Sequence, residues 1–385
     1  MKAANANPLR FALAGMIAMA AAMGIGRFVY TPILPGMMEE LHLSAANAGL
    51  IASANYLGYL AGAFLAAGGW AHGRERPVML GALAANTLLA AVMGLTENLA
   101  AFLAIRFLAG VASAFVMVFL ASIVFGHLAA ARRNDLQALH FGGVGLGIAV
   151  SSAMMAIIVS RGAGWTAGWF WSAALSALAF AAVAAMIDRG PPADGTAARE
   201  PRLPRSRALT KMILSYGLFG FGYVVTATFL VAIVRQGGSG RVFEAVVWMA
   251  AGLSGFPSVW LWQRIAARTG VHAAYAAGCL VEAAGVAASV AVGGHAGPLL
   301  AAVLLGGTFI AVTALGLQEG RQLAPAAPRR VFALMTASFG VGQILGPIVT
   351  GLLAERSGSF VAPSLLAALI LIVSGALAWS ARKGG

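Results

Sequence analysis

The segment DRGPPADGTAAREPRLPRSRALTK, residues 188–211, is the longest polar stretch of this chain. Its prolines and charged side chains are typical of a solvated linker, because such a composition buries too little apolar surface to fold. Six long apolar runs precede this segment and six follow it. The sequence therefore predicts a first domain at 1–187, a basic linker at 188–210 and a second domain at 211–385.

The apolar runs are long enough to cross a lipid bilayer. The chain of 385 residues is 60% hydrophobic and 10% charged, with a mean hydropathy of +0.87, whereas a soluble domain carries about 25% charged residues. About twenty apolar residues span the hydrocarbon core, and a helix pairs all of its own backbone groups there. We expect an all-α integral membrane protein with twelve spans, at 11–31, 45–70, 78–95, 99–127, 137–159, 166–187, 211–234, 243–265, 273–292, 298–323, 331–354 and 360–381.

The distribution of Lys and Arg predicts the orientation. If both termini are cytoplasmic, nineteen of the 25 Lys and Arg residues fall on the inner side and four on the outer side, while Arg27 and Arg106 lie within spans. This is the positive-inside bias of membrane proteins. It explains the net charge of +13 without nucleic acid as a partner. We therefore expect a multi-pass protein of the inner (plasma) membrane with a cytoplasmic linker.

Short motifs recur in the same order in both halves. GIGRFVYT at 24–31 is similar to GFGYVVTA at 220–227, and GVGL at 143–146 is similar to GVGQ at 340–343. The shared order indicates duplication. Two similar halves around a central site are typical of transporters that work by alternating access.

Five motifs carry a resemblance to a known family. GGWAHGRERP at 68–77 and RFLAG at 106–110 resemble motifs of the major facilitator superfamily, although His72 stands where that motif usually has Asp. GIGRFVYTPILP at 24–35, with SANYLGYLAG at 53–62 and GQILGP at 342–347, resembles the YbfB/YjiJ-type branch. The resemblance implies two six-helix bundles, a central cavity lined by spans one, four, seven and ten, and a small-molecule substrate.

Two arginines are the main candidates for a substrate site. Arg27 lies far along the first span and Arg106 lies seven residues into the fourth, so both are at similar depth. An intramembrane charge needs a partner, and a guanidinium grips carboxylate or phosphate at two points. Alternatively, each arginine binds backbone carbonyls or extends to the interface. Further candidates that supply hydrogen-bonding groups are Tyr30, Asn55, Tyr56 and Tyr223, followed by Tyr59, Gln318 and Gln343.

Glu282, near the middle of span nine, is the candidate for carrying protons. A buried carboxyl group exchanges a proton readily in transporters, but it also serves as a hydrogen-bonded packing residue. The chain has no phosphate-binding loop, no cluster of metal-ligand residues and no nucleophile constellation. We therefore expect no enzyme and no cofactor, with a proton gradient as the candidate energy source.

These observations predict a secondary active transporter that moves a small anionic or polar solute and works as a monomer in the lipid bilayer. A proton-driven exporter of drugs or metabolites is the first alternative. A lipid flippase is a further option within transport. A non-transporting membrane sensor or scaffold is the alternative from another class.

Overall fold

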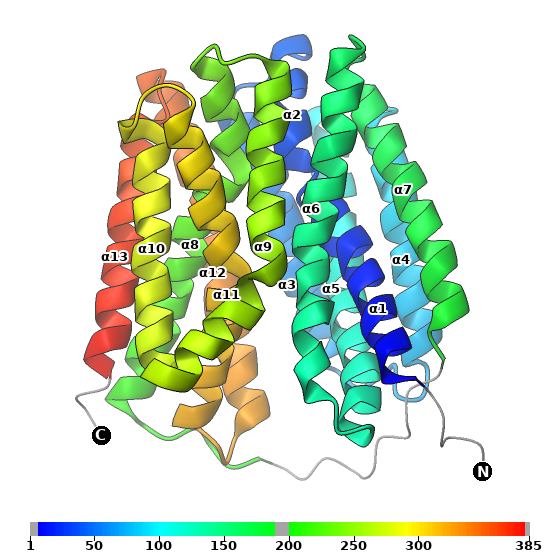
Figure 1. Ribbon diagram of the computed structural model, residues 1–385, viewed down its shortest axis with the longest axis vertical. Coiled ribbons are helices and arrows are strands. Elements are labelled where there is room, and N and C mark those ends of the chain that lie inside the picture. The colour runs from blue at the N-terminus through cyan, green and yellow to red at the C-terminus, as the bar shows by residue number, and fades with distance from the viewer. Residues whose placement is uncertain (1–6, 189–199, 382–385) are drawn as a thin grey trace.

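The computed structural model describes residues 7–188 and 200–381. Within this part, twelve helical segments are long and apolar enough to cross a membrane, as the sequence predicted. The first six segments form an N-terminal bundle and the last six a C-terminal bundle, side by side in Figure 1. The N-terminal bundle consists of α1 (Pro8–Met19), η1 (Ala20–Ile25), α2 (Tyr30–Glu40), α3 (Ala45–Ala66), α4 (Glu75–Met93), α5 (Leu99–Ala130), η2 (Asn134–Leu136), α6 (Gln137–Ser160) and α7 (Trp165–Met186).

The C-terminal bundle consists of α8 (Arg207–Gln236), α9 (Arg241–Thr269), α10 (Val271–Ala291), α11 (Ala296–Leu323), α12 (Pro328–Ser357) and α13 (Val361–Ala381). The predicted boundary at 211 therefore falls inside α8, whose first residue is Arg207. Ser206 caps this helix, because its hydroxyl accepts a hydrogen bond from the Leu209 amide. The remainder of the predicted linker includes residues 189–199, which lie outside the described part of the chain.

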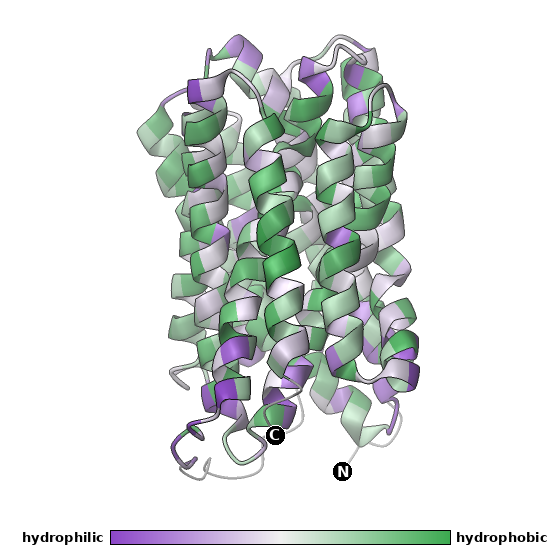
Figure 2. Ribbon diagram, turned by 90° about the vertical axis from the view of Figure 1, so that its left-hand side faces the viewer, coloured by the Kyte–Doolittle hydropathy of each residue, from purple (hydrophilic) through white to green (hydrophobic). Residues whose placement is uncertain are grey.

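The bundles have two ends that differ in their loops. Helix α1 begins, α7 ends, α8 begins and α13 ends at the lower end of Figure 1, which we call the linker end. The opposite, distal end carries the loops between α2 and α3 and between α8 and α9. Figure 2 shows hydrophilic residues concentrated at both ends and hydrophobic ones between them. Large apolar side chains face outward, such as Leu88 at 66% and Leu178 at 70% exposure, as a lipid-facing surface requires.

The first span differs from the prediction of one helix at 11–31. The membrane segment runs from Pro8 to Glu40 and is interrupted between α1 and α2. In η1 the hydrogen bonds shift to the residue five positions back, as in the 2.8 Å bond from the Gly26 amide to the Ala21 carbonyl. The chain then turns at 26–29 before α2 resumes the helix, and Pro32 in the first turn of α2 donates no hydrogen bond to the Phe28 carbonyl.

The bundles meet along α3 with α12, α6 with α9, and α2 with α8. Gly49 on α3 packs directly on the Pro347 carbonyl of α12, where a Cβ atom would clash with backbone. Glu39 binds Arg235 at 2.8 Å and Arg241 at 3.1 Å across the distal end. These contacts position the polar residues of the first span against the C-terminal bundle.

Candidate functional site

The interruption of the first span leaves carbonyl groups that neighbouring helices satisfy. The Ala22 carbonyl accepts hydrogen bonds from Asn86 Nδ2 on α4 at 3.2 Å and from Ser113 Oγ on α5 at 3.1 Å. Asn86 is 4% exposed and Ser113 is fully buried. A buried carbonyl without a partner costs about 1–3 kcal/mol, so these two side chains stabilise the break.

Arg106 binds the same break from α5. Its Nη1 donates to the Gly26 carbonyl at 3.0 Å and its Nη2 to the Arg27 carbonyl at 3.1 Å. Asn55 Nδ2 on α3 in turn donates to the Arg106 carbonyl at 3.0 Å. Both terminal nitrogens of Arg106 are therefore used on backbone, which is the alternative that the sequence left open. A substrate-binding role for Arg106 and Asn55 stays a prediction.

Tyr30 belongs to this structural cluster rather than to an open site. Its hydroxyl donates to the Ala48 carbonyl of α3 at 2.9 Å. Its ring lies 5.2 Å from the Arg106 guanidinium carbon. Tyr30 thus ties α2 to α3 and covers Arg106, and its predicted contact with substrate stays a prediction.

Arg27 has a different environment, although it stands only one residue after Gly26. Its guanidinium carbon lies 4.4 Å from the ring centre of Tyr56 and 4.5 Å from that of Tyr59, both on α3. The residue is 5% exposed, yet Nε and Nη2 have no hydrogen-bond partner in the described part of the chain. Two cation–π contacts thus stabilise the charge, while one edge of the guanidinium keeps free donors.

Tyr223 lies across the bundle interface, inside a stack of aromatic rings. Its ring is nearly parallel to Phe309 at 5.9 Å and to Phe339 at 5.7 Å. Phe28, the neighbour of Arg27, meets Phe309 edge to face at 5.5 Å. Arg27 and the stack are therefore adjacent, joined through Phe28.

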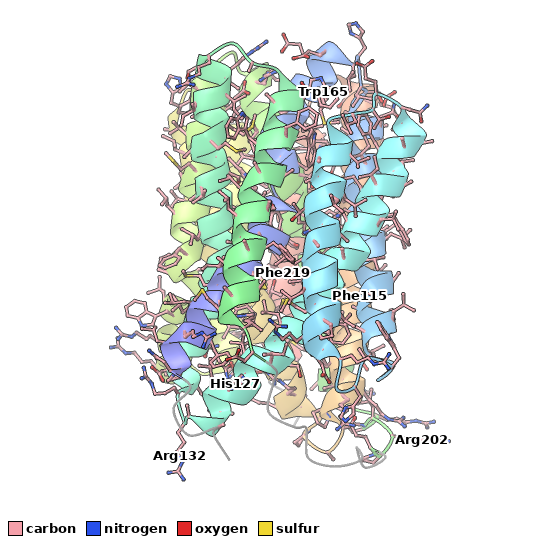
Figure 3. The ribbon with its side chains drawn as sticks, turned by 90° about the vertical axis from the view of Figure 1, so that its right-hand side faces the viewer. Phe115, His127, Arg132, Trp165, Arg202 and Phe219 are labelled. Carbon is pink, nitrogen blue, oxygen red and sulfur yellow. The ribbon has the colours of Figure 1, made fainter. Side chains whose placement is uncertain are left out.

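Two further residues complete this aromatic wall. Gln343 Nε2 donates a short hydrogen bond to the Tyr223 hydroxyl. Phe219, labelled in Figure 3, extends the stack with its ring 5.4 Å from Tyr223. The structure thus brings Tyr56 and Arg27 together, with Tyr223 on the facing bundle.

Sequence reasoning did not select several of these residues. Tyr59 and Gln343 are among the further candidates that the sequence offers, whereas no sequence pattern points to Phe28, Phe309 or Phe339. A phenylalanine inside an apolar span looks the same whether it faces lipid or a site, so no pattern identifies it. The available signal was the position of Phe28 next to Arg27.

Glu282 lies apart from this cluster. It is fully buried on α10, and neither carboxyl oxygen has a hydrogen-bond partner among the described residues. Helix α10 packs mainly on α11 and α13 within its own bundle. Among the described residues, no group of three His, Cys, Asp or Glu side chains is placed to hold a metal ion.

Two six-helix bundles around a shared interface are the architecture of major facilitator transporters. The structure is similar to a mutant of the nucleoside transporter NupG, with a TM-score of 0.77 and 14% identity over 97% of this chain and 99% of that one. It is similar to the inward-facing, occupied bacterial homolog of the human lysosomal transporter Spinster (TM-score 0.71, 12% identity, 98% and 96% covered). It also matches the POT family transporter PepTSo (0.71, 13%, 98% and 98%). At these identities the likeness shows the fold alone.

The chain belongs to the family described as "Uncharacterised MFS-type transporter YbfB", whose family model matches residues 19–379. A curated relative, the uncharacterized MFS-type transporter YceJ of Bacillus subtilis (strain 168), is 34% identical over 94 residues. That match spans 24% of this chain and 24% of the relative, about a quarter of its length. The family resemblance seen in the sequence is confirmed, and it places the chain among transporters rather than enzymes.

Proposed function

We propose that this protein is a secondary active transporter that moves a small anionic or polar solute by alternating access. The observation that carries the proposal is Arg27, a cation buried where the two bundles meet and left with unshared donors. A charge in the membrane interior is costly and marks substrate or ion pathways in membrane proteins. Family membership supports the transport class, and we expect the unit to be a monomer in lipid.

The contacts between bundles support alternating access. The Thr31 hydroxyl donates to the Ala227 carbonyl, and Ser53 Oγ donates to the Ile344 carbonyl at 2.7 Å. Trp248 Nε1 donates to the Phe28 carbonyl at 3.2 Å. These bonds lie in the distal half of the interface, together with the ion pairs of Glu39. Hydrogen bonds and ion pairs between the bundles that gather in the distal half are contacts that rocking of the bundles would have to break.

We place the linker end in the cytoplasm of a cell whose inner membrane holds the protein. Figure 3 shows Arg132 and Arg202 at the linker end, and basic loops face the cytoplasm. The test uses Arg202→Cys and Gln236→Cys, separately, in a Cys279→Ala background. An impermeant thiol reagent should label position 236 from outside intact cells and leave position 202 unlabelled. The reverse pattern would refute the orientation.

Transport itself is tested with the purified chain in proteoliposomes. Vesicles preloaded with a candidate solute should accumulate the labelled solute by exchange, which needs no energy source. Vesicles without protein and vesicles that contain the heat-denatured protein are the controls, and neither should accumulate the solute. If no solute that stabilises the folded protein exchanges, a non-transporting role replaces the proposal.

A proton-driven exporter of amphipathic compounds is the second candidate. The aromatic stack of Tyr223, Phe309 and Phe339 favours it, because flat apolar surfaces bind apolar groups. Glu282 remains the candidate proton carrier. Accumulation in inside-out vesicles under an imposed proton gradient would support export. Accumulation in right-side-out vesicles would support import.

A further inference from the structure

The unshared edge of Arg27 indicates the geometry of its ligand. Nε–H and Nη2–H lie on one edge of the planar guanidinium and point in nearly parallel directions, a fork that matches the two oxygens of a carboxylate. Both nitrogens are buried and have no acceptor in the described part of the chain. Tyr56 and Tyr59 pack on the guanidinium at 4.4 and 4.5 Å and so hold the plane of this fork.

The described residues supply no carboxylate for this fork. Glu244 forms a two-point pair with Arg235 at 2.7 and 2.6 Å. Glu319 lies 3.3 Å from His272, and Glu282 is on α10. No ion pair to Arg27 is found among the described residues, so the fork is open to an acceptor on a bound ligand.

The charge of the ligand follows from the second arginine. Arg106 uses Nη1 and Nη2 on the carbonyls of Gly26 and Arg27. A single guanidinium fork therefore remains at this depth. This fork grips one carboxylate at two points, whereas Arg106 keeps only its Nε donor unshared and offers no second fork, so we expect a monocarboxylate to fit better than a phosphate or a dicarboxylate.

The remainder of the ligand is defined by the aromatic wall next to Arg27. The Arg27 guanidinium carbon is 5.8 Å from the Phe28 ring, and the Phe28 ring is 5.5 Å from Phe309. The Tyr223 ring lies 11° from parallel to the Phe309 ring and 10° from parallel to the Phe339 ring. Flat parallel rings favour a flat, apolar or aromatic body over a sugar-like polar one.

We propose that the site binds a monocarboxylate with an apolar, preferably aromatic body, whose carboxylate takes the Nε and Nη2 edge of Arg27 and whose body packs on the stack of Phe309, Tyr223 and Phe339. This assignment deepens the proposed transport function and rests on it. It names a substrate class that the family membership does not specify.

The first test compares acids with their amides on the unmodified protein. The probes are phenylacetate, indole-3-acetate, hexanoate and acetate, together with phenylacetamide, indole-3-acetamide and phenylphosphonate. A ligand that binds only the folded state raises the melting temperature. The aromatic acids should raise it, acetate should raise it less, and the amides and phenylphosphonate should have at least tenfold weaker affinity. If no acid raises it, or if an amide or the phosphonate binds as well as its acid, the assignment is wrong.

The second test uses variants of both parts of the site. Arg27→Lys keeps the charge and loses the fork, so the affinity for phenylacetate should fall at least tenfold. Phe309→Leu should weaken phenylacetate and leave acetate unchanged. Arg161→Gln, an exposed arginine of the distal loops, is the matched control and should bind as the original protein does. Unchanged phenylacetate affinity in Arg27→Lys would overturn the proposal. If that variant does not fold, the comparison of acids with amides still decides.

Exchange measurements separate this assignment from the transport proposal. Binding of aromatic acids without their exchange in proteoliposomes would refute transport and support the site. Exchange of another solute class that aromatic acids do not inhibit would support transport and refute the site.

Discussion

Two arginines at similar depth in the membrane have different chemical roles because their neighbours differ. Arg106 is 2% exposed and uses its terminal nitrogens on the carbonyls of Gly26 and Arg27. Arg27 is equally enclosed but keeps the Nε and Nη2 donors unshared. A hydrogen bond from a charged donor contributes about 1.5–3 kcal/mol, so the two residues should respond differently to substitution.

Replacing Arg106 should mainly lower the stability of the folded protein, rather than change which ligands it binds. Arg106→Gln removes two charge-assisted hydrogen bonds to the break, and we expect the free energy of unfolding to fall by roughly 2–4 kcal/mol. The melting temperature of the detergent-purified protein measures this loss. Arg161→Gln is the control, because an exposed substitution changes stability by less than about 0.5 kcal/mol. A stable Arg106→Gln protein that no longer binds substrate would instead assign Arg106 to the site.

Glu282 can be tested without disturbing the packing around it. Its carboxyl is fully buried without a hydrogen-bond partner among the described residues, and Gln has nearly the same shape but cannot release or take up a proton at physiological pH. If protons drive transport through Glu282, then Glu282→Gln should abolish accumulation driven by a proton gradient and spare exchange. The exposed Glu97→Gln is the control. Accumulation that persists in Glu282→Gln would make Glu282 a packing residue.

At the scale of elements, the break between α1 and α2 depends on close packing against α4. A Cβ atom on Gly26 would collide with Asn86 Nδ2 and lie 2.7 Å from the Ala22 carbonyl oxygen. The same Asn86 side chain satisfies the Ala22 carbonyl at 3.2 Å. The glycine and the asparagine therefore form one structural unit that sets the position of Arg27.

A double-mutant cycle tests this unit. Gly26→Ala should destabilise the protein by about 1–3 kcal/mol, because overpacking forces neighbours to move. Asn86→Ala alone should cost about 1 kcal/mol, since Ser113 still binds the Ala22 carbonyl. The double variant should be more stable than the sum of the two losses predicts, because the shorter side chain at position 86 leaves room for the new Cβ atom at position 26. Strict additivity in the melting temperatures would show that the two residues are independent.

At the scale of the whole molecule, ionic contacts join the bundles at the distal end. Glu39 of the N-terminal bundle binds Arg235 and Arg241 of the C-terminal bundle. The Glu39 side chain is 53% exposed and that of Arg235 is 24% exposed. Partly exposed pairs of this kind contribute about 0.2–1 kcal/mol each, enough to bias an equilibrium between two arrangements of the bundles.

Removing the charge of Glu39 should therefore favour separation at the distal end. We expect Glu39→Gln to shift the equilibrium by a factor of roughly two to ten for a loss of about 0.5–1.4 kcal/mol. Spin labels on Glu97→Cys and Gln236→Cys, in a Cys279→Ala background, report the distance between the bundles by pulsed electron resonance. A population at longer distance should grow in Glu39→Gln. The neighbouring Glu40→Gln removes the same charge outside these ion pairs. A response equal in both variants would mean that net charge, and not the ion pairs, sets the balance.

The sequence by itself determined the twelve spans, their division into two bundles and the family, because the length and polarity of each run are local properties that the bilayer selects directly. It also predicted Arg27, Tyr56 and Tyr223 as site residues, since polar groups in hydrocarbon are conspicuous, and that role stays a prediction. Only the tertiary structure decided that the first span breaks and resumes as far as Glu40, and that Arg106 binds the backbone at this break. It also decided that Phe28 and Phe309 join Arg27 to an aromatic stack. The reason is physical: whether a buried donor is satisfied, or a ring faces lipid or another ring, depends on atoms from helices far apart in the chain, and no local pattern records which atoms those are.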